Sequence, residues 1–228
     1  MLTIKKKHNL DFDSDSYLNN IHRQFNNVVR FAVNRVMKDN IDKESDIEKL
    51  VKEVMKNIDD LDASWIKTAV KKGRGIAVDN RSKSVIESGK KRKIYFGGKK
   101  NFFERKYSKI TEEEYKDLKL MPLNMRGAKG DPSGNRKATL LDAFTFMFKP
   151  KKGKEYIIDL KLSKNERKML EVIAKECKEG TNYFNFEIDK EYVYITFEEP
   201  TIEKEKIVNV KSNRFLGIDL NPNYIAIS

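Results

Sequence analysis

The chain has 228 residues, of which 36% are charged, and its formal net charge is +12. This length allows a packed core in one large domain or two small ones, and a positive surplus of this size favours a polyanionic partner, most often nucleic acid. The single cysteine, Cys177, excludes an internal disulfide and a cysteine-based zinc site. The N-terminus lacks the apolar region of a signal peptide and no stretch approaches membrane-spanning length, so we expect a cytoplasmic protein without a membrane partner.

The first residues predict a strand that is followed by a helical block. Met1–Lys5 is β-compatible, and we expect its pairing partners to lie far away in the sequence. A lysine cluster overlaps its end, and Lys5, Lys6 and Lys7 are candidates for contacts with nucleic acid. Apolar residues then recur every three or four positions, which predicts a long helix whose cap is chosen from Ser14, Asp15 or Ser16.

Two further helices complete the predicted block. We expect the second to be capped by Ser45 and the third to begin near Trp65. The segment Lys71–Gly75 contains two glycines, so we expect it to break the third helix, with a weaker helical stretch over 76–87. Trp65 fits a core anchor of this bundle better than a platform on which bases stack.

The composition changes at Gly89. Between Gly89 and Lys109 the chain carries nine basic residues against one acid, Glu104, with aromatic residues between them. Cations that neutralise phosphates, beside rings on which bases stack, are typical of single-stranded nucleic-acid binding. The alternative is that the rings are the buried face of strands; we assign Phe96 and Phe103 to the core. The candidate contacts in this segment are Lys90, Lys91, Arg92, Lys93, Tyr95, Lys99, Lys100, Arg105 and Lys106.

A short capped helix and a basic loop follow. Thr111 begins the helix, which we expect to end near Leu118. The segment Arg126–Lys137 is rich in turn residues, and its glycines permit a close approach of the backbone to phosphates. A plain exposed loop is the alternative. The candidate contacts here are Arg126, Lys129, Asn135, Arg136 and Lys137.

The remainder alternates between β and α patterns. We expect strands over 138–148 and 155–162, and a helix over 164–178 that is capped by Ser163. The cleanest hairpin pairs 183–188 with 192–197, and a charged connector over 201–208 leads to a last hairpin. In that hairpin the apolar run 215–218 ends at Asp219. Two interpretations remain for this acid: it caps a solvated turn, or it is held in place to bind a cation.

Two stretches resemble a known family. Leu216–Ala226, which contains Asp219, resembles the first RuvC motif of the TnpB family, the transposon-encoded RNA-guided DNA nucleases related to type V CRISPR effectors. Ile94–Arg105 is similar to a motif in the N-terminal half of the same family, and the loop ending at Lys137 also resembles it. The resemblance implies that Asp219 is a catalytic residue and a ligand of Mg²⁺, one of three carboxylates that hold two such ions. It also implies guide RNA and double-stranded target DNA as partners.

The expected fold class is α+β, a β-barrel interrupted by a helical insertion. By the resemblance, residues 1–13 and 89–208 form an oligonucleotide-binding-like barrel, the wedge domain. Residues 14–88 form the helical recognition lobe within it, and 209–228 begin an RNase H-like RuvC domain. Because the family's other two catalytic carboxylates have no counterpart in the sequence, we expect these residues alone not to cut DNA and to work with a separate C-terminal nuclease half.

Three functions remain open at this stage. The first is the guide-RNA- and target-DNA-binding part of an RNA-guided DNA endonuclease, of either the TnpB or the type V CRISPR kind. The second is a nuclease-inactive relative, or a truncated remnant, that binds without cutting. The third is a small basic RNA-binding domain whose last hairpin only mimics the motif.

Overall fold

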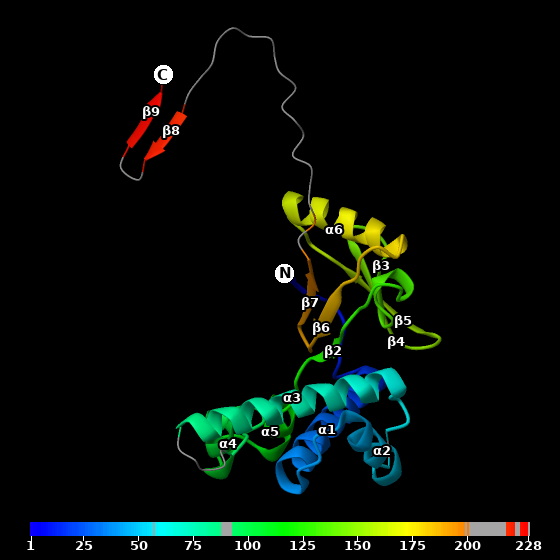
Figure 1. Ribbon diagram of the computed structural model, residues 1–228, viewed down its shortest axis with the longest axis vertical. Coiled ribbons are helices and arrows are strands. Elements are labelled where there is room, and N and C mark those ends of the chain that lie inside the picture. Colours follow the sequence, from blue (N-terminus) through cyan, green and yellow to red (C-terminus); the bar gives the residue numbers. More distant parts are fainter. Residues whose placement is uncertain (57, 88–92, 199, 201–217, 222–223, 228) are drawn as a thin grey trace.

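The computed structural model describes residues 1–56, 58–87, 93–198, 200, 218–221 and 224–227 (Figure 1). This part of the chain is α+β, as predicted: helices α1 to α5 gather at one end, and two antiparallel sheets with helix α6 lie at the other. No helix in these ranges combines the length and the apolar character needed to cross a membrane.

Three helices form the block between the first strand and the remaining strands: α1 (Ser16–Asp39), α2 (Glu44–Val54) and α3 (Ala63–Glu87). Asp15 caps α1 by accepting hydrogen bonds from the amides of Tyr17 and Leu18, which confirms one of the three predicted caps. The cap predicted for α2 is wrong. Lys43 occupies the N-cap position of α2 and its side chain makes no capping hydrogen bond, whereas Ser45 lies inside the first turn of the helix.

The predicted break in α3 is also wrong, since one helix runs through both glycines. Gly73 is buried against α1, where a Cβ atom would lie 2.5 Å from the Val29 carbonyl oxygen and 2.7 Å from the Ala32 Cβ. A glycine within a helix costs about 1 kcal/mol, which is too little to break a helix that packs along its length. Gly73 therefore allows α1 and α3 to approach closely.

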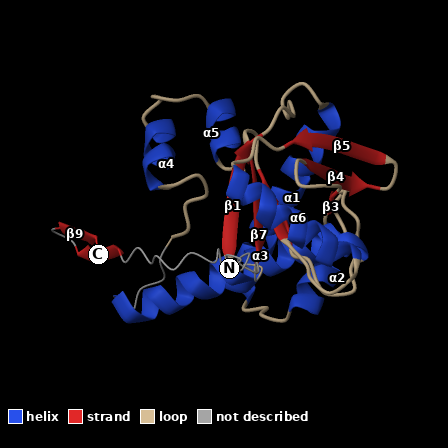
Figure 2. Ribbon diagram, turned by 90° about the horizontal axis from the view of Figure 1, so that it is seen from above, coloured by secondary structure: helices blue, strands red, loops and turns tan. Residues whose placement is uncertain are grey.

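The four-stranded sheet confirms that the first strand pairs with a distant one. Its order is β1-β7-β6-β2, and β1 pairs antiparallel with β7. Figure 2 shows β1 and β7 side by side. The predicted hairpin near 183–197 is confirmed as β6 and β7. The bounds are β1 (Leu2–Lys7), β2 (Leu123–Met125), β6 (Asn185–Ile188) and β7 (Tyr192–Phe197).

The second sheet has the order β3-β4-β5, with β3 (Ala138–Leu140), β4 (Thr145–Lys151) and β5 (Lys154–Asp159). One strand was expected over 138–148, but two strands joined by a turn occupy it. The carboxylate of Asp142 accepts hydrogen bonds from the amides of Phe144 and Thr145, at 2.6 and 2.8 Å. An Asp that bonds the backbone two and three residues ahead stabilises such a turn.

The remaining helices are α4 (Lys99–Lys106), α5 (Glu112–Leu118) and α6 (Lys164–Lys178). Thr111 and Ser163 cap α5 and α6 as predicted, each in a reciprocal capping box with the Glu three residues later. The helix α4 occupies Lys99–Lys106, where strands were the alternative interpretation of the basic aromatic segment. The rings of Phe102 and Phe103 therefore do not belong to the buried face of a strand.

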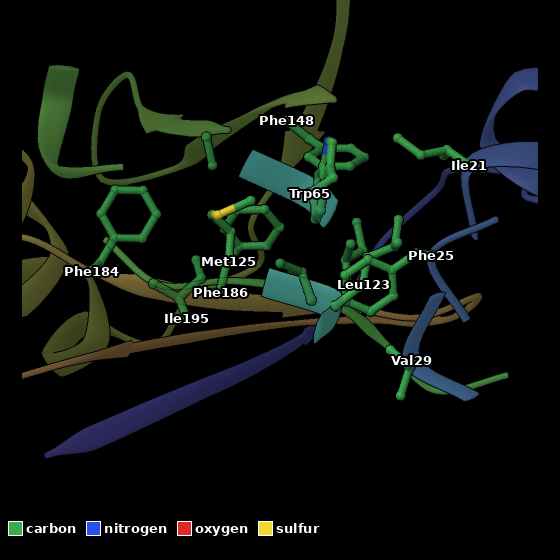
Figure 3. Packing of buried hydrophobic residues seen from close by; sticks show 14 of the residues in the cluster. Ile21, Phe25, Val29, Trp65, Leu123, Met125, Phe148, Phe184, Phe186 and Ile195 are labelled. Atoms are coloured by element: carbon green, nitrogen blue, oxygen red, sulfur yellow. The ribbon is translucent and has the colours of Figure 1, made fainter. Parts of the chain in front are cut away.

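Trp65 joins the helical block to the sheets, as expected of a core anchor. Its ring is 0% exposed and makes edge contacts with Phe25, Phe148 and Phe186 (Figure 3). Its indole Nε1 donates a hydrogen bond to the Pro150 carbonyl oxygen at 2.8 Å. The buried ring is therefore unable to act as a platform for bases.

The C-terminal hairpin is confirmed as β8 (Ile218–Asn221) paired with β9 (Tyr224–Ile227), in which Asp219 lies opposite Ala226. The predicted charged connector lies outside the described residues. The described strands form separate sheets, and a closed barrel remains a hypothesis.

Candidate nucleic-acid interface

A cleft of about 790 Å³ runs between α3 and the segment that continues from β2 into the basic loop. The loop closes with a short 3₁₀ turn, η1 (Pro132–Gly134). Residues that line the cleft are Ala63, Ser64, Lys67, Thr68, Lys71, Lys72, Gly75, Ile76, Asp79, Asn124, Met125, Arg126, Gly127, Ala128, Asp131, Arg136 and Glu187. We call this the α3 cleft.

The helix side of the α3 cleft presents two unpaired cations. Lys67 and Lys71 are one turn apart, both exposed, and neither has a carboxylate partner within the described ranges. Lys72 beside them is more deeply placed: its Nζ donates to the Pro122 carbonyl oxygen at 3.1 Å and lies 3.8 Å from a Glu187 carboxylate oxygen. Burial lowers the pKa of Lys72. Lys67 and Lys71 thus remain available to an anion.

Gly75 continues the same stripe, two turns beyond Lys67. A Cβ atom at Gly75 would meet nothing within 4 Å, in contrast to the crowded site at Gly73. Packing within the described chain therefore gives no reason for a glycine at this position. The absence of a side chain at Gly75 leaves the helix backbone uncovered at this point of the cleft.

The loop side of the cleft carries Arg126 and Arg136. Arg126 is exposed and has no carboxylate partner in the described part of the chain. The Arg136 Nε lies 2.6 Å from a carboxylate oxygen of Asp131, which also accepts a hydrogen bond from the Ala128 amide. Hydrogen bonding to Asp131 raises the pKa of Arg136. The guanidinium of Arg126 is therefore the freer of the two.

Two predicted contacts of this loop are buried instead. Asn135 is 2% exposed, and its side-chain amide donates to the carbonyl oxygens of Met125 and Phe184 at 3.3 and 2.9 Å. Lys137 is 7% exposed, forms an ion pair with Asp62, and donates to the Pro150 carbonyl oxygen at 3.2 Å. Both side chains hold the loop in place, and neither lines the α3 cleft. Lys129 is exposed on the same loop.

Two strands of the four-stranded sheet, β2 and β6, contribute residues to the cleft. Asn124, Glu187, Tyr194 and Lys5 lie opposite one another across β2, β6, β7 and β1, so their side chains share one face of the sheet. The first two line the cleft. The side-chain oxygen of Asn124 is buried without a hydrogen-bond partner in the described structure, which costs free energy until a donor satisfies it.

Other lysines of β1 differ in their surroundings. The Lys5 ammonium lies 3.9 Å from the centre of the Tyr192 ring and 5.4 Å from that of Tyr194. Lys6 points to the other face and pairs with Glu166 of α6 at 2.8 Å, whereas Lys7 is exposed. The structure thus brings Lys5 to the sheet face that continues from the cleft, and it directs Lys6 away.

The basic aromatic segment forms a separate cluster around α4. The rings of Tyr95, Phe102, Phe103, Tyr107 and Tyr115 contact one another with centroids 5.0 to 6.3 Å apart. Phe103 is only partly buried, so its assignment to the core is wrong, while Phe96 packs against the core. Tyr107, which is 64% exposed, is the most exposed of the five rings.

The cations of this segment surround those rings. The Lys93 Nζ lies 4.5 Å from the centre of the Phe102 ring, and the Lys106 Nζ 5.9 Å from that of Tyr107. Lys99 and Lys100 are exposed at the start of α4. The predicted contacts Lys90, Lys91 and Arg92 lie outside the described residues.

The described residues do not provide a magnesium site. They contain no group of three or more His, Cys, Asp or Glu side chains that could hold a metal ion. Asp219 is the one acid in the described residues of β8 and β9, and a single carboxylate does not position two divalent ions.

The histidines and the cysteine are structural. The Nε2 atoms of His8 and His22 lie 2.9 and 2.8 Å from backbone carbonyl oxygens, and burial lowers both pKa values. Burial raises the pKa of the Cys177 thiol to about 11, so the thiolate needed of a nucleophile is scarce at neutral pH.

Sequence reasoning missed four residues of the α3 cleft: Lys67, Lys71, Gly75 and Asn124. A signal was present, because two lysines and a glycine recur at intervals of four on a helical pattern. Because a helix break was expected over 71–75, these three residues were not assigned to one face of a single helix. Nothing in the local sequence indicated Asn124, since its place depends on strands paired across the chain.

Comparisons with known proteins leave the family open. The chain matches no protein-family model, and a search of the curated proteins finds no match.

Proposed function

We propose that this chain binds nucleic acid through the α3 cleft. The observation that carries the proposal is the convergence of Lys67, Lys71 and Arg126 on one open cleft without carboxylate partners in the described structure. Cations that remain unpaired along a groove are suited to phosphates, since neutralising phosphates releases counterions and supplies most of the affinity. Two of the three acids that line the cleft are already engaged, Asp131 with Arg136 and Glu187 with Lys72. The third, Asp79, is exposed one turn beyond Gly75.

The resemblance to the TnpB family gives this proposal its more specific form. In that form the chain is the guide-RNA- and target-DNA-binding part of an RNA-guided DNA endonuclease. Residues 14–88 correspond to a recognition lobe, residues 1–13 and 89–208 to a wedge-type barrel, and 209–228 to the start of a RuvC domain. The α3 cleft lies between the first two parts, where a duplex bound by its backbone and shape would contact both.

The proposal assigns no chemistry to the chain alone. Under it, Asp219 becomes a Mg²⁺ ligand only when further carboxylates are supplied by a nuclease half. Mg²⁺ bound there would stabilise the attacking and leaving oxygens of a phosphodiester. The residues of this chain contribute binding and orientation.

A charge-matched pair of variants tests the proposal. In the cleft variant, Lys67, Lys71 and Arg126 are each replaced by Gln; in the control variant, the exposed residues Lys161, Lys164 and Lys168 are replaced in the same way. Both lose three positive charges, so a difference between them reports location and not net charge. Fluorescence anisotropy with labelled RNA and duplex DNA measures the affinity.

We expect the cleft variant to bind roughly 10- to 100-fold more weakly than the wild type, from about 0.5–1 kcal/mol per lost contact. The control variant should lose much less. Equal losses in the two variants would show that binding follows net charge, and the α3 cleft would then have no special role.

A further inference from the structure

A second group of cations lies away from the α3 cleft, where α1, α4 and α5 meet. It consists of Arg30 on α1, Arg105 on α4 and Lys119 just after α5, and none of the three lines the α3 cleft. All three are partly buried. Burying a cation is unfavourable unless an anion or hydrogen-bond acceptors compensate it.

The position of Arg30 follows from the helix geometry. His22, Asn26 and Arg30 recur at intervals of four and so share one face of α1. The first two bind the backbone of Met121: His22 Nε2 lies 2.8 Å from its carbonyl oxygen, and the Asn26 amide oxygen accepts from its amide at 2.8 Å. Arg30 is one turn further along this face, and its charge acts on Lys119, which lies two residues before Met121.

The ring of Tyr115 joins the other two cations. The Lys119 Nζ lies 4.6 Å from its centre, and the Arg105 Cζ lies 5.1 Å from it. The Tyr115 side chain itself is buried. The ring of Tyr115 thus holds the Lys119 ammonium and the Arg105 guanidinium close to each other.

Two donor nitrogens of this group have no partner within the described structure. The Arg30 Nη1 and the Arg105 Nε are buried without a hydrogen-bond partner. Arg30 donates from Nη2 to the Asn27 side chain at 2.6 Å, and Arg105 pairs with Glu112 at 2.9 Å. Glu112 is the only acid paired with any of the three among the described residues. Burial, and after it the charge of Arg30, lowers the pKa of Lys119.

We propose that Arg30, Arg105 and Lys119 form a binding site for a phosphate group. A tetrahedral oxyanion presents several acceptors to converging N–H donors and relieves the repulsion between the three cations. The phosphate is either a phosphodiester of a nucleic-acid strand or a free phosphate ion. The site shares no residue with the α3 cleft, so it can exist whether or not the cleft binds nucleic acid.

Thermal unfolding in phosphate tests this site. The wild type is compared in about 50 mM sodium phosphate and in sodium chloride of equal ionic strength. A site with a Kd near 5 mM would raise Tm by about 3–5 °C in phosphate. The variants Arg30→Met and Lys119→Gln should lose this shift. Arg35→Met is the control, because Arg35 lies on the same helix and pairs with Asp39 at 2.8 Å, and it should keep the shift.

Further results distinguish the outcomes. Equal shifts in all variants would mean a general salt effect on the protein surface, and the proposal would be overturned. If Arg30→Met does not fold, Lys119→Gln and phosphate line broadening in the ³¹P spectrum of the wild type decide the matter. The probe for a strand is a dinucleotide whose only phosphate is the phosphodiester between its two nucleosides. If it displaces phosphate, the ligand is a nucleic-acid strand; if it does not, the ligand is free phosphate. A functioning phosphate site with an inactive α3 cleft would refute only the proposed function.

Discussion

Replacing Gly75 by alanine is expected to stabilise the fold and to weaken binding in the α3 cleft. The added methyl group would meet nothing within 4 Å, so no clash offsets the gain in helix propensity. That gain is about 0.5–1 kcal/mol. For a chain of this size it corresponds to a rise in Tm of roughly 1–4 °C.

Gly73 provides the matched control two residues away on the same helix. There a Cβ atom would lie 2.5 Å from the Val29 carbonyl oxygen and 2.7 Å from the Ala32 Cβ, and both neighbours belong to the closely packed α1. Overpacking of this kind costs about 1–3 kcal/mol, which exceeds the gain in propensity. We therefore expect Gly73→Ala to be destabilised by about 1–2 kcal/mol.

Chemical denaturation with a fluorescence readout measures both stabilities, and anisotropy measures the affinity for nucleic acid. The account predicts opposite signs for the two stabilities. Gly75→Ala should bind several-fold more weakly although it is more stable, because the methyl group occupies space left open to the partner. A destabilised Gly75→Ala would refute the reasoning about packing. A stabilised variant with unchanged affinity would refute the role of Gly75 in binding.

Three further predictions address other parts of the chain. Lys137→Met should lower the free energy of unfolding by about 1–2 kcal/mol at neutral pH. Burial raises the pKa of Asp62, but hydrogen bonds from Lys137 and its other partners bring this pKa below its usual value, so the stabilisation is present above about pH 4 and is lost on acidification. Denaturation measured over a series of pH values should therefore show the variant approaching the stability of the wild type at acidic pH. Cys177 should resist a thiol reagent at about pH 8 in the native state and react after unfolding, which a native reaction would contradict. The chain mixed with guide RNA, matched duplex and Mg²⁺ should leave the DNA uncut, since Asp219 is without further carboxylates in the described structure; guide-dependent cleavage on a gel would contradict this.

Local signals predicted many elements correctly because their causes are local. Ser163 and Thr111 each stand three residues before a Glu, and the capping boxes they form begin α6 and α5 where expected. The distant pairing of the first strand was also inferred correctly, since a lone strand before a helical block needs a partner elsewhere. The β1–β7 ladder provides that partner.

The errors arose where tertiary contacts override local preference. Gly73 looks like a helix breaker until α1 is packed against it, and only the structure supplies that neighbour. Lys137 looks like a loop cation that is free to bind phosphate, but Asp62, far away in the sequence, pairs with it in the interior. Asn124 joins the cleft only because β2 pairs with β6. The composition indicated a polyanionic partner, whereas the residues proposed to contact it are brought together only by folding.

The salt dependence of binding tests the central claim most directly. The logarithm of the association constant is measured against the logarithm of salt concentration for duplex DNA, with wild type, the Lys67/Lys71/Arg126 variant and the Lys161/Lys164/Lys168 control. If the α3 cleft neutralises phosphates, the slope of the cleft variant should be shallower than that of the wild type by about 2 to 3, and the control should keep the wild-type slope. Identical slopes for all three proteins would contradict the proposal that the cleft binds nucleic acid.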